Sequence, residues 1–135
     1  MRIVIDGRMY NESGIGRYIR NLIAQLQIID QKNEYYILYL KDNYDTLVLD
    51  NEVIASSAYN NNFHKVLADF RWYSVGEQIK LPGLLKSLKP DLVHFPHFNV
   101  PIRYDGKFVV TIHDLIHQHF SMEKSTTHGP AIYKL

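Results

Sequence analysis

Residues 2–29, RIVIDGRMYNESGIGRYIRNLIAQLQII, decide the fold of this 135-residue chain. Residues 2–5 are a β-branched apolar run that stops at Asp6, which predicts a short buried strand. A polar loop containing glycines follows it. Apolar residues then recur from Ile15 to Ile29 at the spacing of one helix face, which predicts a helix of about four turns. A strand, a loop and an amphipathic helix in this order form the first half of a βαβ unit.

The rest of the chain continues to alternate between candidate strands and helices. Apolar runs predict further strands at residues 34–40, 52–55, 63–68, 91–95 and 107–112, with an Asn-rich turn at 60–62. A helical segment at 74–89 is expected to divide into two helices at Pro82, because proline fits best in the first turn of a helix. The alternation predicts the α/β class: a Rossmann-like parallel sheet with helices on both faces.

Composition excludes several classes of function. Lys and Arg number 15 against 14 Asp and Glu, a net charge of +1, so no large field directs the chain to nucleic acid or anionic lipid. The absence of cysteine excludes disulfide scaffolds, thiol nucleophiles and thiolate metal sites. No signal-peptide core follows Met1, and no apolar run approaches the ~20 residues that span a bilayer. We therefore expect a cytoplasmic protein, at most peripheral to the inner face of the membrane.

The glycine loop after the first strand is a candidate phosphate site. Gly14, Ile15 and Gly16 precede the helix at the position where α/β sheets collect ligands, and backbone N–H groups at a helix N-terminus attract anions. Arg17 follows directly. Ile19 replaces the third small residue of the dinucleotide fingerprint, and no Walker A pattern is present, which disfavours both of those nucleotide sites. The alternative is that the glycines only form a tight turn into the helix.

Two other segments carry charged or aromatic side chains near the predicted strand ends. Arg8 is expected to pair with Asp6 or with a neighbouring segment of the chain, and an exposed surface pair is the simplest interpretation. Residues 70–73, Phe-Arg-Trp-Tyr, are expected to pass from the surface to the core and are a candidate contact for a partner or an acceptor.

Six of the seven histidines lie after residue 90. Four candidate site residues lie at the ends of two predicted strands: His94, His97, His113 and Asp114. Carboxyl ends of parallel strands share one edge, so we expect these side chains to approach the glycine loop. Three interpretations remain open. In the first, His113 donates a hydrogen bond to a substrate hydroxyl or phosphate, while Asp114 orients the site or contacts a partner group. In the second, the histidines only form hydrogen bonds under loops. In the third, a metal site, the ligands are His94, His97, His113, His117 and His119, although a loop His-x-x-His lacks the chelating helical spacing.

Taken together, these motifs resemble the N-terminal half of glycosyltransferase family 4 enzymes. The matching segments, in chain order, are MRIVIDGR (1–8), SGIGRYIRNL (13–22), EQIKLP (77–82), KPDLVHFP (89–96) and VVTIHDLI (109–116). The resemblance covers most of the chain apart from residues 41–70. Such enzymes have two Rossmann-like domains facing each other across a cleft, the GT-B arrangement. They transfer a sugar from a nucleotide-sugar to an acceptor hydroxyl with retention of configuration and without a metal.

The resemblance implies roles for the candidate residues. Gly14, Ile15 and Gly16 would lie near the donor diphosphate, and His113 and Asp114 would act at the reacting sugar. Contacts to the acceptor or substrate are implied for Arg8, Tyr10, Arg17, His94 and His97. No cofactor is implied beyond the nucleotide-sugar donor, and the other partner would be a glycan or lipid-linked acceptor. No nucleic acid is expected.

The resemblance also implies how the chain is organised. Residues 1–135 are expected to be a single acceptor-side domain, with the nucleotide-binding C-terminal domain and its Glu-x7-Glu pattern absent, so that this part alone is inactive. A predicted helix starting at Pro130 likewise indicates a fragment. The face that would meet the second domain is expected to allow self-association. The alternatives are a non-catalytic Rossmann-like domain that binds a phosphorylated or sugar ligand or a protein partner, and a metal-dependent hydrolase.

Overall fold

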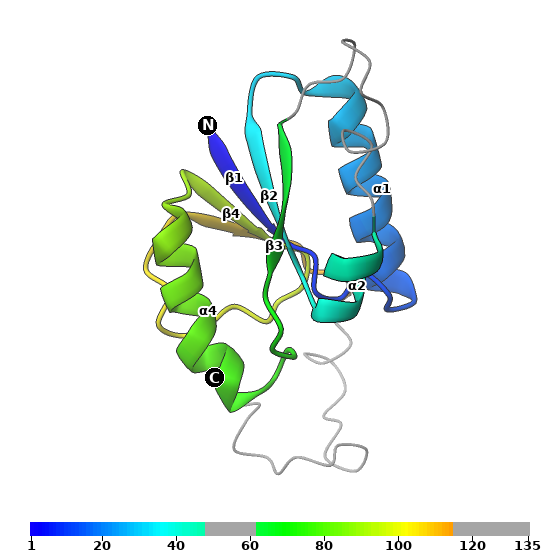
Figure 1. Ribbon diagram of the computed structural model, residues 1–135. Coiled ribbons are helices and arrows are strands. Elements are labelled where there is room, and N and C mark those ends of the chain that lie inside the picture. Colours follow the sequence, from blue (N-terminus) through cyan, green and yellow to red (C-terminus); the bar gives the residue numbers. More distant parts are fainter. Residues whose placement is uncertain (48–61, 115–135) are drawn as a thin grey trace.

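The computed structural model describes residues 1–47 and 62–114 (Figure 1). The elements are, in order, β1 (Arg2–Asp6), α1 (Gly14–Ile29), β2 (Glu34–Tyr39), α2 (Lys41–Thr46), β3 (Phe63–Leu67), α4 (Val75–Leu88), β4 (Leu92–Phe95) and β5 (Phe108–Val110). The strand expected at 52–55, most of the turn at 60–62, the helix expected from Pro130 and three histidines lie outside the described residues. Those histidines are His117, His119 and His128.

The described strands form one five-stranded, all-parallel sheet in the order β3-β2-β1-β4-β5. Ile3 in the central strand is in register with Tyr35 of β2 on one side and Leu92 of β4 on the other. Because parallel neighbours need crossover connections, helices lie between the strands as far as β4, whereas residues 96–107 connect β4 to β5 without a helix. The predicted Rossmann-like α/β class is confirmed.

Helices cover both faces of the sheet. Figure 1 shows α1 and α2 on one face and α4 on the other. Successive strand residues point to opposite faces, so the strands divide their apolar side chains between two cores. The core under α1 includes Ile5, Ile37, Ile19 and Ile23. The core under α4 includes Val4, Leu38, Val93, Leu81 and Leu85.

The segment at residues 74–89 is one helix, so the prediction of two helices meeting at Pro82 is wrong. α4 runs through this proline, and the buried side chains of Leu81 and Leu85 flank it. Burying both leucines against the sheet outweighs the ~3 kcal/mol that an interior proline costs a helix. Lys89 ends α4 in the left-handed region at a φ of 50°.

α2 is an element that the sequence patterns did not predict. Its six residues lack an apolar stripe, and its side chains include the exposed pair Lys41 and Asp45, 3.2 Å apart at a spacing of i, i+4. A short polar helix of this kind carries little periodicity, which is why residues 41–46 gave no helical signal. The other predicted elements that lie within the described residues match the structure to within two residues at each end.

β5 pairs only with β4 among the described strands. Its three residues are apolar but are 43%, 48% and 37% exposed. A run of apolar residues of this kind is typical of a parallel strand buried on both faces. Within the described ranges, no helix is long and apolar enough to cross a lipid bilayer.

Candidate functional site

The order of the strands places a topological switch point between β1 and β4. From β1 the chain builds outward to β2 and β3, then returns to add β4 on the opposite side of β1. The connections diverge at this topological switch point, and open α/β sheets bind ligands there, at the carboxyl ends of the strands. The loop after β1, the start of α1 and the loops after β4 and β5 all meet this end of the sheet, which we call the carboxyl edge.

Within residues 1–47 and 62–114, no side-chain hydrogen bond caps the backbone N–H groups at the N-terminus of α1. Ser13 precedes the helix without making a capping hydrogen bond, and no acidic residue lies in the first turn. α4 begins differently: the Ser74 hydroxyl accepts a hydrogen bond from the backbone N–H of Glu77 at 3.0 Å. The first amides of α1 therefore keep the positive end of the helix dipole available for an anion.

The two glycines of this turn have different structural roles. A Cβ on Gly16 would lie 2.9 Å from the carbonyl oxygen of Met9 and closer still to that of Tyr10, so the loop leaves no room for a side chain. A Cβ on Gly14 would meet nothing within 4 Å. Gly16 is therefore required for the close packing of the turn, as in the alternative in which the glycines only form a tight turn into the helix. Gly14 is not required for this packing, and it leaves the helix N-terminus open.

Two of the predicted histidines meet the first turn of α1 through Tyr18. The ring of Tyr18 makes edge contacts with His113, at 5.0 Å between centroids, and with His94, at 6.1 Å. Thr111 Oγ1 lies 3.1 Å from the Tyr18 hydroxyl and 2.9 Å from Nε2 of His94. Burial lowers the pKa of His94 below its usual value. The cluster joins the ends of β4 and β5 to the start of the glycine-flanked helix.

Arg8 pairs with Asp6, as predicted, and also with Glu77 from another segment of the chain, but it is buried rather than exposed. Its Nε and Nη2 donate to Asp6 at 2.9 and 2.7 Å, and Nη2 also reaches Glu77 at 2.5 Å. Nη1 donates to the Phe70 carbonyl at 3.1 Å. Burial by itself lowers the pKa of Arg8, but the two carboxylates outweigh it and raise the pKa above its usual range. With its donors turned inward, Arg8 does not fit the implied contact with acceptor or substrate.

Glu77 is a residue of this site whose burial the sequence analysis did not anticipate. Its side chain is fully buried, and it accepts hydrogen bonds from Asn99 Nδ2 at 2.8 Å and from the backbone N–H of Tyr73 at 2.9 Å. Tyr73 has a φ of 60°, an unfavourable conformation for a tyrosine that this bond helps to hold. The spacing Ser74-x-x-Glu77 is a capping-box pattern that signals a helix start, although not a buried ion pair.

A small cavity lies beneath the carboxyl edge. Its volume is about 10 Å³, which is room for one water molecule, and its lining includes Arg8, Ile15, Trp72, His97 and Asn99. His97 is further tied to Tyr73, whose hydroxyl lies 3.2 Å from Nδ1, and it packs on Phe98 with 4.0 Å between ring centroids. A ligand larger than water must therefore bind on the open edge above these residues rather than in this cavity.

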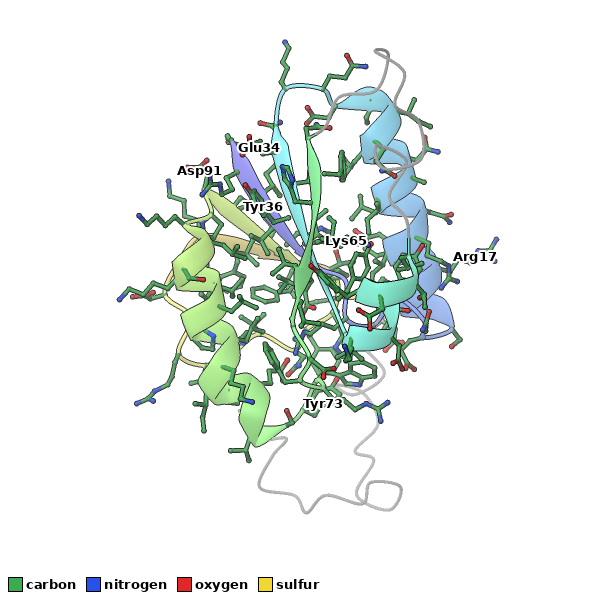
Figure 2. All side chains as sticks on the ribbon, viewed as in Figure 1. Arg17, Glu34, Tyr36, Lys65, Tyr73 and Asp91 are labelled. Atoms are coloured by element: carbon green, nitrogen blue, oxygen red, sulfur yellow. The ribbon has the colours of Figure 1, made fainter. Side chains whose placement is uncertain are left out.

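The remaining predicted residues lie apart from the Tyr18 cluster. Tyr10 packs edge-on against Tyr39, with ring centroids 5.6 Å apart. Arg17 is exposed and projects outward from α1 (Figure 2). Asp114 follows His113 at an exposed position. The structure thus brings Gly14, Ile15, Gly16, His94 and His113 to one region. The backbone of Tyr10 lies beside Gly16, but its ring packs on Tyr39, and the side chain of Arg17 points away.

The metal interpretation has no support within residues 1–47 and 62–114. No group of three His, Cys, Asp or Glu side chains in these ranges could hold a metal ion. His117 and His119, two of its five candidate ligands, fall outside the described part of the chain.

The fold is an open, all-parallel α/β sheet, and the carboxyl edge at its β1/β4 switch point is the candidate ligand site. Comparison with protein-family models, curated proteins and solved structures gives no match at any of the three levels. A more specific function therefore rests on the site chemistry and on the sequence motifs.

Proposed function

We propose that this chain is the acceptor-side domain of a retaining GT-B glycosyltransferase of family 4 type. In this proposal the diphosphate of a nucleotide-sugar binds at the N-terminus of α1, and His113 faces the donor sugar. The observation that carries it is the uncapped start of α1 at Gly14, placed one turn before Tyr18, which contacts His113 at 5.0 Å. An uncapped helix N-terminus and a histidine side chain thus lie together at the switch point of the sheet.

The chemistry of sugar transfer suits such an arrangement. When the bond between the sugar and the diphosphate breaks, negative charge develops on the departing diphosphate. Backbone N–H groups held at a helix N-terminus stabilise that charge without having to reorganise. The hexose then passes to an acceptor hydroxyl, as in glycan or polysaccharide synthesis. A second domain would supply most nucleotide contacts, so this domain by itself binds donor weakly and does not turn it over.

Titration of the chain with nucleoside diphosphates and nucleotide-sugars tests the proposal, with NMR shifts as the readout. We expect dissociation constants from high micromolar to millimolar, about −4 to −6 kcal/mol. Gly14→Glu should abolish binding because its carboxylate repels the diphosphate. It should not harm the fold, since the site is open and a helix N-terminus favours an acidic residue.

Gly83→Glu is the matched control. Gly83 lies in α4, and a Cβ there also meets nothing within 4 Å. This variant should bind as the wild type does. Binding that survives Gly14→Glu would place the phosphate elsewhere. Equal affinity for a simple sugar phosphate and for a nucleotide-sugar would favour the alternative of a non-catalytic binding domain.

A further inference from the structure

We infer that Glu77 and Tyr73 are positioning residues for His97. The buried carboxylate of Glu77 holds the backbone of Tyr73 in the left-handed region, so that the Tyr73 hydroxyl meets Nδ1 of His97 and fixes that ring at the carboxyl edge. A contact between His97 and a ligand rests on the proposed function, but the orientation of the ring does not. The inference therefore goes beyond the proposed function.

The strained backbone of Tyr73 is not explained by its place in the chain. Among residues 1–47 and 62–114, only Tyr73 and Lys89 are non-glycine residues with a positive φ, of 60° and 50°. Lys89 ends α4, where a left-handed residue commonly stops a helix. Tyr73 instead precedes Ser74, which caps the start of α4, and the left-handed region strains any residue that has a Cβ.

Burial of the Tyr73 side chain offsets little of this strain, because the residue is 54% exposed. A strained residue persists only where its surroundings hold it, and such residues cluster at functional sites. The hydrogen bonds of Tyr73 therefore have to supply what burial does not.

The Glu77 carboxylate holds Tyr73 through an altered capping box. In the usual capping box, the acidic residue accepts a hydrogen bond from the backbone N–H of the capping residue itself. Ser74 keeps its half of the pattern, since its hydroxyl accepts from the N–H of Glu77 at 3.0 Å. Oε2 of Glu77, however, accepts from the N–H of Tyr73, one residue earlier, at 2.9 Å. Arg8 and Asn99 bind the same carboxylate, so its position is itself fixed.

The left-handed Tyr73 makes a contact between two loops of the carboxyl edge. Its hydroxyl lies 3.2 Å from Nδ1 of His97, 24 residues further along, and the two rings meet at 77° with centroids 6.0 Å apart. Asn99, two residues after His97, donates to both oxygens of Glu77 at 2.8 Å. One carboxylate thus anchors both the backbone that carries the Tyr73 hydroxyl and the loop that carries His97.

The alternative is that Glu77 only stabilises the fold by pairing with Arg8. That pair uses Oε1 of Glu77, whereas the N–H of Tyr73 donates to Oε2, so the ion pair alone does not require a left-handed Tyr73. A purely structural role would also leave the ring of His97 unaffected when the Tyr73 hydroxyl is removed.

Substitutions at Tyr73 measure its backbone conformation. Glycine is free of strain in the left-handed region and alanine is not, so Tyr73→Gly should have a higher urea midpoint than Tyr73→Ala. Lys89→Gly and Lys89→Ala, at the other positive φ, should show the same order. At Ile79, an exposed position inside α4, alanine should give the higher midpoint. A higher midpoint for Tyr73→Ala than for Tyr73→Gly would overturn the inference.

The role of Glu77 is measured at the Tyr73 amide by hydrogen exchange of the full 135-residue chain. A hydrogen bond to a buried carboxylate should protect this amide, although the residue is largely exposed. Glu77→Met removes the acceptor, leaves Asp6 as the partner of Arg8, and should abolish both the protection and the preference for glycine at position 73. Protection that persists in folded Glu77→Met would overturn the inference. So would an unprotected amide in the wild type, a result that does not depend on the folding of any variant.

The ring of His97 reports the positioning itself, in NMR spectra assigned with His97→Gln. We expect nuclear Overhauser contacts between the ring protons of Tyr73 and His97, and restricted motion of the His97 ring in ¹³C relaxation. Tyr73→Phe keeps the aromatic ring and the amide but removes the hydroxyl. The His97 ring signals should therefore shift and the ring should become more mobile, with little change in the urea midpoint. The ring signals of His94, which bonds Thr111 instead, should not move.

The outcomes separate the inference from the proposed function. Unchanged signals and motion of the His97 ring in Tyr73→Phe would show that Glu77 and Tyr73 only support the fold, and would overturn the inference. None of these measurements uses a ligand. A failure of nucleotide-sugars to bind would thus overturn the proposed function without bearing on how His97 is held.

Discussion

Arg8 and Glu77 lie 69 residues apart in the chain, yet Nη2 and Oε1 of the two side chains are 2.5 Å apart, at side-chain exposures of 1% and 0%. The pair joins the loop after β1 to the first turn of α4. Asn99, in the loop after β4, binds the same carboxylate. One buried carboxylate therefore holds three segments of the carboxyl edge together.

Glu77→Gln should lower the free energy of unfolding by about 3 kcal/mol. The substitution keeps the shape of the side chain, but it replaces a charged acceptor by an amide whose –NH₂ faces the donors of Arg8, Tyr73 and Asn99, so buried hydrogen bonds to a charged group are lost. Urea denaturation followed by the fluorescence of the single tryptophan, Trp72, measures the loss. Asp45→Asn removes the exposed partner of Lys41 and should change stability by less than about 1 kcal/mol. A loss in Glu77→Gln no larger than in that control would contradict the prediction.

Gly14→Ala and Gly16→Ala should have opposite effects on stability. Alanine at Gly14 enters open space in the helix and should raise the free energy of unfolding by up to about 1 kcal/mol. Alanine at Gly16 meets two backbone carbonyl oxygens that cannot move aside easily, and should cost about 1–3 kcal/mol. Thermal and urea unfolding of both variants give the comparison. Equal effects would mean that the loop around Tyr10 relaxes freely.

His94 should make the domain less stable as the pH falls below neutral. Burial lowers its pKa in the folded state from 6.5, so below about pH 6.5 the unfolded chain binds the proton more readily. The stabilisation by neutral His94 is thus fully present above the unfolded pKa and is lost as the pH decreases towards the folded one. Urea midpoints at about pH 7.5 and about pH 5.5 should differ less in His94→Gln than in the wild type. An unchanged pH dependence in the variant would rule out His94 as its source.

Val109→Lys should reduce self-association of the chain with little change in stability. Val109 is 48% exposed on β5, the outermost described strand next to β4. An exposed apolar edge strand favours pairing with another chain, and a lysine there opposes it. Sedimentation velocity over a range of concentrations measures the association. Val75→Lys, at an exposed position on α4, is the control. Equal association of both variants and the wild type would show that β5 is not the contact.

The fold was predictable because its signals are local. The alternation of buried apolar runs with the stripe from Ile15 to Ile29 identified a parallel α/β sheet. Pro82 led to the wrong prediction of two helices. The sequence shows that an interior proline destabilises a helix, but it does not show that burial of Leu81 and Leu85 compensates for this.

The site was predictable only where chain topology alone brings residues together. Strand ends and the glycine turn were expected at one edge, and the structure places His94 and His113 beside the first turn of α1. The burial of Arg8 depends on Glu77, and the orientation of His113 depends on the Pro96 carbonyl. Such contacts join residues that are far apart in the chain, so neither the periodicity nor the spacing of the sequence predicts them.

The position of β1 in the middle of the sheet has a consequence during synthesis. β1 leaves the ribosome first but needs β4 as its second neighbour, and the backbone N–H of Arg2 donates to Asp91, 89 residues further along. At ~5–20 residues per second, about 5 to 20 s separate the emergence of these partners. Throughout that interval one side of β1 offers unpaired backbone groups to a chaperone or to a neighbouring nascent chain. The arrival of β4 therefore sets the earliest moment at which the domain can close.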